Sequence, residues 1–246
     1  MKPVYTLSTK QLNKFCLELF MALIGSQNYN IHTIKSDADF KVIGAPTKHM
    51  LYTGKNLQEE VNVSTGILAY KDLRDYGYLL SSSNINFVET LFSTQIILLD
   101  ERFKSILEFL LEHREQIARM NIPHLFNSSK GMANRGFKEA NSKTEWNKSA
   151  RNSLRVTHTF LRYAESDFNN YESALYFTGA EREKLLLLQD GSVPFEEYAE
   201  EYNILQEKML SYGNVCSSFE VNSSLKEQIE KLFIDFLFSP NVIKDI

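Results

Sequence analysis

The sequence has little of what builds a disulfide framework or a zinc site. Its two cysteines, Cys16 and Cys216, lie 200 positions apart, so they form neither a disulfide framework nor a Cys-x-x-Cys metal motif. The five histidines, at positions 32, 49, 113, 124 and 158, do not have the spacing of zinc ligands. We therefore expect reduced, buried thiols.

Long apolar runs are also absent. No segment near the N-terminus has the length of a signal-peptide core, and the apolar run at residues 19–24 is too short to span a bilayer. Internal repeats, low-complexity tracts and the glycine-rich motifs of Rossmann and P-loop proteins are missing as well. These absences predict a cytoplasmic protein with no membrane partner.

What the chain does have is the composition of an ordinary globular protein. Its 246 residues are 43% apolar and 24% charged, which is enough to bury a core in one domain or two small ones. The net charge of −4 argues against broad nonspecific binding to nucleic acid. Between residues 127 and 163, however, eight cations stand against two carboxylates, so this segment carries +6 and the remainder −10. A local basic surface there could bind phosphates.

The stretch at residues 25–39 carries the most specific chemistry. It begins with Gly25 and Ser26 and ends with Asp37 and Asp39, which would lie side by side on one face of a strand because their positions differ by two. Two such carboxylates suit Mg²⁺, which takes one or two protein carboxylates and completes its shell with water and substrate phosphates. The Gly-Ser turn could aim N–H groups and a hydroxyl at those phosphates. The alternative is a solvated acidic turn, which is common on protein surfaces.

The remaining elements follow from periodicity and capping residues. The run at 19–24 is predicted as a buried strand, although a helix stays open because short apolar runs are ambiguous. A polar segment at 128–143 should be a loop that is mobile or ordered by ligand. The predicted elements are a helix to about residue 17 capped by Ser8 or Thr9, strands at 19–24, 39–43 and 63–70, a helix at 71–80, a helix at 100–119 capped by Asp100, and helices at 148–155, 179–188 (capped by Thr178), 195–210 and from Ser224.

Three motifs, taken in order, carry a resemblance. The first is the segment 25–29, GSQNY, with its following aspartates; the second is 84–92, NINFVETLF; the third is the helix at 148–155, KSARNSLR. Together they resemble the nucleotidyltransferases of the DNA polymerase β superfamily, especially a bacterial and phage branch that includes enzymes associated with RNA repair. Asn30 stands where glycine is usual in that branch, and Asn152 stands where histidine is usual.

The resemblance implies an α+β nucleotidyltransferase fold, with a small mixed β-sheet and a helical C-terminal half. Residues 1–125 would form the nucleotidyltransferase core and residues 126–246 a helical part that closes over the nucleotide. Asp37 and Asp39 would hold Mg²⁺ and act in catalysis. Gly25, Ser26, Lys148, Asn152 and Arg155 would bind a nucleoside triphosphate. Its nucleoside monophosphate would pass to an acceptor hydroxyl on RNA or protein, in the host cytoplasm if a phage encodes the chain.

One feature departs from this pattern. The third metal-binding aspartate of the family falls on Ile67 or Ala69, and neither side chain can bind a metal or accept a proton. Glu59, Glu60 and Asp72 are the candidate substitutes, but none has the expected spacing.

This departure supports an alternative function. A catalytically weakened relative could bind a nucleotide, an RNA end or a protein partner, for example as a phage counter-defence factor. In the same way, the cations near Arg155 could form a solvated basic helix face instead of a phosphate clamp.

Overall fold

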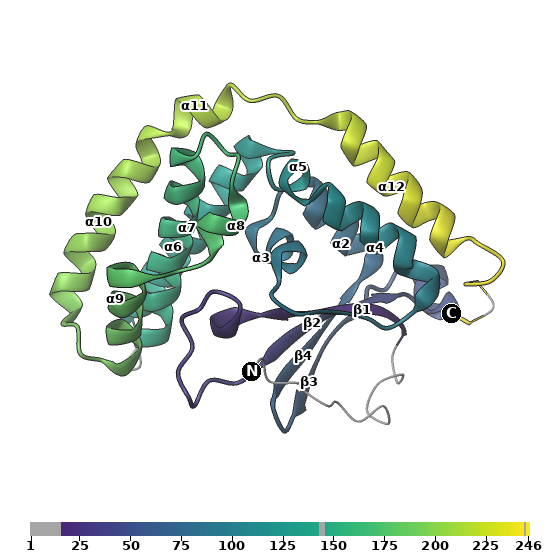
Figure 1. The fold of residues 1–246 in the computed structure, drawn as a ribbon, viewed down its shortest axis with the longest axis horizontal. Coiled ribbons are helices and arrows are strands. Elements are labelled where there is room, and N and C mark those ends of the chain that lie inside the picture. Colours follow the sequence, from purple (N-terminus) through teal and green to yellow (C-terminus); the bar gives the residue numbers. More distant parts are fainter. Residues whose placement is uncertain (1–15, 143–145, 244) are drawn as a thin grey trace.

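Helices arch over a small β-sheet in the computed structural model, which describes residues 16–142, 146–243 and 245–246 (Figure 1). The sheet has five strands in the order β3-β4-β2-β1-β5, and β2 and β4 are parallel while the other neighbours are antiparallel. The strands are β1 (Leu17–Ile24), β2 (Asp39–Ala45), β3 (Gln58–Val63), β4 (Gly66–Asp72) and β5 (Ile96–Leu98). The predicted α+β architecture, a small mixed sheet followed by a helical C-terminal half, is confirmed.

Both faces of the sheet are apolar, which explains the hydrophobic run at residues 19–24. In β1, Phe20 and Ala22 belong to a large buried cluster, whereas Met21 and Leu23 belong to a smaller one on the opposite face. The strand prediction for this run is therefore confirmed, and the helix alternative is wrong. The predicted helix from Ser8 or Thr9 lies almost wholly outside the described residues.

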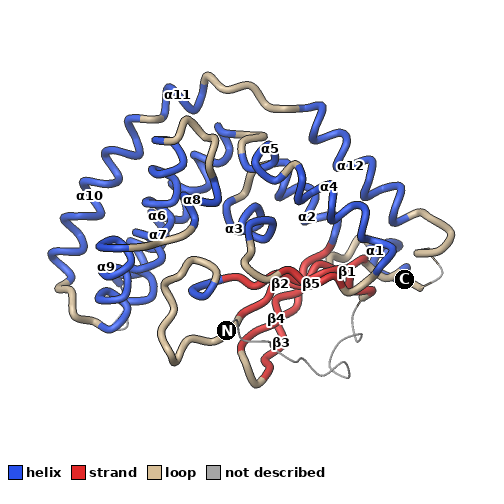
Figure 2. Tube along the Cα trace, in the orientation of Figure 1, coloured by secondary structure: helices blue, strands red, loops and turns tan. Residues whose placement is uncertain are grey.

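Helices from both halves of the chain lie over one side of the sheet (Figure 2), and their buried residues belong to the larger cluster. They include α2 (Leu73–Ser81), α4 (Lys104–Glu112) and α12 (Ser223–Leu237). Phe233 of α12 packs against Tyr76 of α2, with ring centroids 6.4 Å apart, and against Phe103, at 6.1 Å. The last helix therefore packs on the first half of the chain. No helix in the described part of the chain is long and apolar enough to cross a bilayer.

The other elements are shorter or belong to the helical half. They are η1 (Gly25–Gln27), α1 (Lys48–Thr53), α3 (Ile85–Val88), η2 (Glu89–Phe92), η3 (Glu101–Phe103), α5 (Arg114–Ala118), α6 (Ile122–Ser142), α7 (Asn147–Glu165), α8 (Tyr171–Leu175), α9 (Gly179–Asp190), α10 (Phe195–Ser211) and α11 (Gly213–Ser217).

The predicted strand at 63–70 is wrong in its bounds, because this region contains a hairpin of β3 and β4. The edge strand β3, QEEVNV, has exposed or half-buried side chains and therefore lacks the apolar pattern of a buried strand. Gly66 begins β4 where the chain passes close to the start of β2. A β-carbon placed on Gly66 would lie 2.5 Å from the carbonyl oxygen of Ala38, so only glycine fits there.

The predicted loop at 128–143 is also wrong, because residues 128–142 belong to helix α6, and residue 143 lies outside the described residues. From residue 128 onward, the buried residues of α6 are small and follow helical spacing: Ser129, Ala133, Gly136 and Ala140. They allow α6 to approach α7 closely: a β-carbon placed on Gly136 would lie 3.0 Å from the carbonyl oxygen of Ser149. Glycine and serine therefore mark a close helix contact in this segment, although they usually indicate loops.

Smaller corrections concern helix ends. Asp100 caps only the short turn η3, by accepting a hydrogen bond from the Arg102 N–H, and the predicted helix at 100–119 is divided at His113 into α4 and α5. Thr178 occupies the N-cap of α9 without a side-chain bond, and Asn222, not Ser224, caps α12.

Candidate functional site

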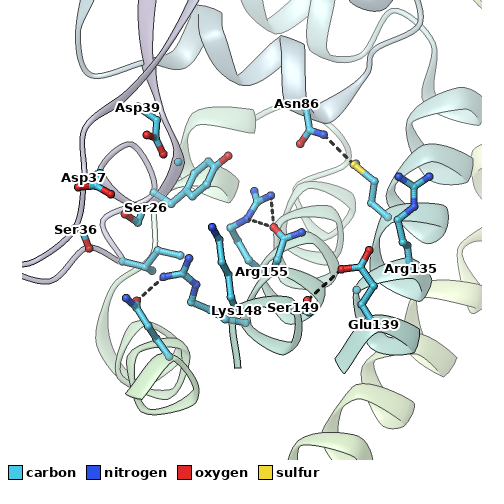
Figure 3. A pocket seen from close by; sticks show the side chains of 18 of the residues that line it. Ser26, Ser36, Asp37, Asp39, Asn86, Arg135, Glu139, Lys148, Ser149 and Arg155 are labelled. Atoms are coloured by element: carbon cyan, nitrogen blue, oxygen red, sulfur yellow. Dashed lines mark hydrogen bonds between the residues drawn. The ribbon is translucent and has the colours of Figure 1, made fainter. Parts of the chain in front are cut away.

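A cavity of about 750 Å³ lies between the sheet and the helices α6 and α7. Figure 3 shows residues from the sheet side facing residues from the two helices across it. Its walls include every residue that the sequence pointed to as a metal or nucleotide ligand: Gly25, Ser26, Asp37, Asp39, Lys148, Asn152 and Arg155. Segments more than 100 positions apart in the chain therefore meet at one site.

Gly25 lies next to Asp39 at the end of β1. Its φ of +75° allows the chain to turn sharply into η1, where the N–H groups of Asn28 and Tyr29 bond to the Gly25 carbonyl. A β-carbon placed on Gly25 would lie 3.6 Å from Oδ2 of Asp39. The turn that carries Ser26 is thus adjacent to a carboxylate, as the sequence analysis expected.

The two aspartates differ in their setting. Asp39 is the first residue of β2 and is half-buried, and its Oδ1 accepts a hydrogen bond from the Ile67 N–H at 3.0 Å. Asp37 is exposed and precedes the strand, so the expectation that both lie on one strand is wrong. The loop before β2 is instead held by Gln27, whose amide donates to the carbonyl oxygens of Ser36 and Asp37. Both carboxylates nevertheless line the cavity.

The position of the missing third acid can be read from the sheet. β2 and β4 pair Phe40 with Leu68 and Lys41 with Ala69, which puts Ile67 beside Asp39. Ile67 is therefore the residue that occupies the neighbouring position, and Ala69 lies one step further along, beside Lys41.

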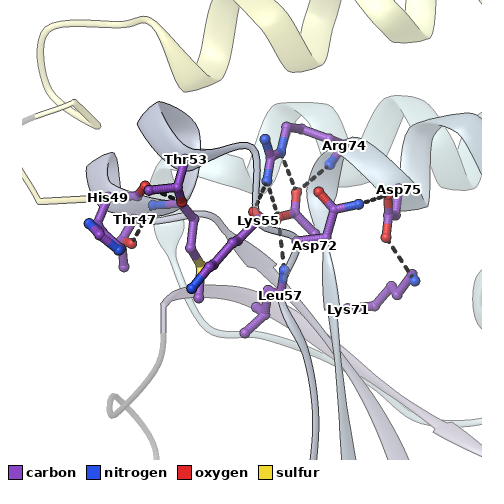
Figure 4. Close-up of polar contacts among 11 residues, drawn as sticks. Thr47, His49, Thr53, Lys55, Leu57, Lys71, Asp72, Arg74 and Asp75 are labelled. Carbon is purple, nitrogen blue, oxygen red and sulfur yellow. Dashed lines mark hydrogen bonds and ion pairs between the residues drawn. The ribbon is translucent and has the colours of Figure 1, made fainter.

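None of the possible substitutes reaches this place. Glu59 and Glu60 are exposed on the edge strand β3. Asp72 is fully buried at the far end of β4, where it caps α2, accepts from the Leu57 N–H at 3.2 Å and pairs with Arg74 at 2.8 Å (Figure 4). Among the described residues, no three His, Cys, Asp or Glu side chains gather in a way that could hold a metal.

The basic wall comes from α7. Lys148, Asn152 and Arg155 follow one another at i, i+4 and i+7 on the face toward the cavity. Arg155 is only 5% exposed, and its Nε and Nη2 donate to Oδ1 of Asn152 at 3.2 and 3.0 Å. Its Nη1 is buried and has no hydrogen-bond partner among the described residues. Asn152 therefore orients the guanidinium.

A buried polar network packs against this arginine. The guanidinium lies 4.1 Å from the ring centroid of Tyr29, and the Tyr29 hydroxyl donates to the buried carboxylate of Glu89. Burial raises the pKa of Tyr29 well above its usual range, so the hydroxyl stays protonated. Lys41 is also buried; its ammonium donates to the Asn86 carbonyl and lies 4.0 Å from the Phe87 ring centroid. Burial lowers the pKa of Lys41, while the charge of Glu89 opposes that shift.

Several cavity residues were not expected as ligands from the sequence. They add cations from three elements: Lys35 from the loop before β2, Arg135 from α6 and Arg151 from α7. Glu139 of α6, which accepts from the Ser149 hydroxyl at 3.2 Å, adds a third carboxylate on the helix side. The charge imbalance at residues 127–163 was the signal for Arg135 and Arg151. Overall, five cations and three carboxylates line the cavity.

Comparisons with known proteins add little to this geometry. No protein-family model and no curated protein sequence matches the chain. A crystal structure of a nucleotidyltransferase-like protein from Exiguobacterium sibiricum 255-15 is similar, with a TM-score of 0.30 and 12% sequence identity over 90% of this chain and 85% of that one. A similarity of this size says nothing about shared chemistry.

Proposed function

We propose that this cavity binds a nucleoside triphosphate together with Mg²⁺. The observation that carries the proposal is the unpartnered Nη1 of Arg155. A buried donor without an acceptor is costly, and a buried guanidinium is best satisfied by an anion that it can contact with two parallel N–H groups. The phosphates of a nucleotide supply such an anion.

The distribution of charge supports the same ligand. Lys148, Arg151 and Arg155 stand on the helix side, so they can neutralise phosphate oxygens, while Asp37 and Asp39 stand on the sheet side. Two carboxylates with phosphate oxygens and water form a coordination shell that Mg²⁺ accepts. Bound there, Mg²⁺ would supply a link between the phosphates and the sheet. The hydroxyl and amides of the Gly25–Gln27 turn, which lines the cavity through Gly25 and Ser26, would contact the phosphates.

The volume also suits a nucleotide, since sites for small molecules and cofactors measure about 300–1,000 Å³. Beyond the charged groups, the cavity wall contains the thioether of Met132 and the backbone at Gly136. These uncharged surfaces could accommodate the nucleoside.

The reaction that this arrangement could serve is transfer of the nucleoside monophosphate to an acceptor hydroxyl of RNA or protein. The acceptor oxygen would bond to the α-phosphorus, the bond to pyrophosphate would break, and the hydroxyl proton would leave to solvent. We expect this transfer to be slow, because the isoleucine beside Asp39 cannot help to activate the acceptor. Ile67 therefore favours a second candidate function, a nucleotide-binding protein that transfers little or nothing, for which the partner could be an RNA end or a protein.

Calorimetric titration of the protein with each nucleoside triphosphate, with and without Mg²⁺, tests the proposal. Lys148 is exposed, so Lys148→Ala should leave the fold intact and weaken binding on the order of fivefold. Lys231→Ala, which removes an exposed lysine from α12, is the matched control and should change nothing. Absence of Mg²⁺-dependent binding for every nucleotide would refute the proposed function.

A further inference from the structure

One oxygen of Asp39 already has a backbone partner on the β4 side. Its Oδ1 is already bonded to the Ile67 N–H at 3.0 Å, and its Oδ2 lies on the side of Gly25. A carboxylate that serves two metal ions 3.5–4 Å apart, as in two-metal enzymes, normally needs both oxygens. Here the oxygen on the β4 side is occupied by the backbone.

The neighbouring strand supplies no second carboxylate beside Asp39, because its one carboxylate, Asp72, lies at its far end. Leu68 and Tyr70 point into the smaller apolar cluster, so Ile67 and Ala69 lie on the other face of β4, the face that Asp39 occupies on β2. Ile67 is the direct neighbour of Asp39, and its side chain has no metal-binding atom. The place where a second cation would sit is therefore bordered by a methyl-rich side chain.

The next residue on this face is a buried lysine. Lys41 follows Asp39 by two positions, a separation of about 6.6 Å along a strand. Its Nζ donates to the Asn86 carbonyl and lies over the Phe87 ring, and the residue is only 8% exposed. Because its Nζ is already engaged by a backbone carbonyl and an aromatic ring, Lys41 supplies no ligand atom for a second divalent cation beside Asp39.

We infer that the site holds one divalent cation per bound nucleotide, on the Gly25 side of Asp39, and excludes a second cation on the Ile67 side. This inference depends on the proposed function, because the nucleotide phosphates complete the shell of the single cation. Asp37 and Oδ2 of Asp39 are its protein ligands. The acceptor side of the site then has no cation, so nucleotide binding persists where transfer is slow.

Counting bound Mn²⁺ tests the inference directly. The full chain is titrated with Mn²⁺ in the presence of a saturating, non-hydrolysable nucleoside triphosphate analogue, and bound Mn²⁺ is measured by electron paramagnetic resonance. We expect one equivalent with the spectrum of an isolated ion. Two equivalents with spin coupling between neighbouring ions would overturn the inference but leave the proposed function standing. If neither the analogue nor Mn²⁺ binds, the proposed function fails and the inference fails with it.

A pair of variants at one position locates the excluded cation. Ile67 is half-buried, so Ile67→Asp and the uncharged control Ile67→Asn make similar demands on the fold. We expect the aspartate to raise bound Mn²⁺ from one equivalent to two, and the asparagine to leave it at one. If folded Ile67→Asp protein still binds one equivalent, residue 67 does not decide the stoichiometry and this part of the inference is wrong.

Discussion

Replacing Arg155 by methionine should separate a ligand-binding role from a structural one. Arg155 lines the cavity and is almost fully buried, yet its Nη1 has no partner among the described residues. If Arg155 only stabilises the fold, its replacement should strongly lower the free energy of unfolding. If it binds an anion, its replacement should mainly weaken the affinity for the ligand.

The expected change in stability is small because opposing terms nearly cancel. The two hydrogen bonds to Asn152 and the contact with the Tyr29 ring contribute about 2–3 kcal/mol together. The unpartnered, desolvated Nη1 costs about 1–3 kcal/mol, and methionine removes that cost while filling the space with apolar atoms. Glu89 still accepts its hydrogen bond from the Tyr29 hydroxyl. The free energy of unfolding should therefore change by about 1 kcal/mol or less, which is about 2–4 °C in Tm.

The expected loss of affinity is much larger. Buried hydrogen bonds from a guanidinium to phosphate are worth about 2–3 kcal/mol, so Arg155→Met should raise the Kd for a nucleoside triphosphate by about 30- to 150-fold. Arg155→Lys keeps the positive charge but lacks the planar guanidinium. Its Kd should therefore lie between those of the unmodified protein and Arg155→Met.

Urea unfolding of the free proteins and calorimetric titration with nucleotide measure the two quantities separately. An unchanged Kd would remove Arg155 from the ligand site. If the free protein instead loses more than about 3 kcal/mol of unfolding free energy, far more than the expected change, the arginine is chiefly structural.

Three further predictions concern the metal ligand, the helix contact and a buried histidine. Asp37→Asn should weaken Mg²⁺-dependent nucleotide binding at least about tenfold in calorimetry, whereas Asp235→Asn on the exposed side of α12 should not. Gly136→Ala should lower the free energy of unfolding by about 1–3 kcal/mol, because the new β-carbon would meet the α7 backbone. Gly131→Ala, whose β-carbon would meet nothing within 4 Å, should raise the free energy of unfolding by about 0.5–1 kcal/mol. Equal effects of the two substitutions in urea unfolding would contradict the packing described. Burial lowers the pKa of His158 in the folded chain, so as the pH falls the unfolded chain binds a proton at a higher pH than the folded chain does. The free energy of unfolding should therefore decrease as the pH drops below about 6.5. In His158→Gln, it should depend less on pH between about pH 5 and 7.

The sequence predicted the parts of the fold that depend on short-range pattern. The buried strand at 19–24 and the start of β2 at Asp39 followed from apolar runs and alternation. The hairpin at β3 could not be read, because an edge strand with Glu59 and Glu60 in solvent has no apolar face to reveal it. Helix α6 was missed since its small residues serve a contact with α7 that exists only in three dimensions.

The site was predictable in its residues but not in its geometry. Charge and spacing pointed to Asp39, Lys148 and Arg155, which the structure brings to one cavity. The surroundings of each residue depend on long-range partners. The Ile67 N–H donates to Oδ1 of Asp39. Arg155 contacts the ring of Tyr29, whose hydroxyl donates to Glu89. Such partners are fixed by strand register and helix packing, which no local pattern records.

A crystal structure of the full chain with Mg²⁺ and a non-hydrolysable nucleoside triphosphate analogue tests the central claim most directly. We predict that the triphosphate lies between the Gly25–Gln27 turn and α7, with a phosphate oxygen within hydrogen-bond distance of Arg155 Nη1 and Mg²⁺ bound by Asp37 and Asp39. A nucleotide bound elsewhere on the molecule, or bound in this cavity with Arg155 Nη1 still unpartnered, would contradict the account.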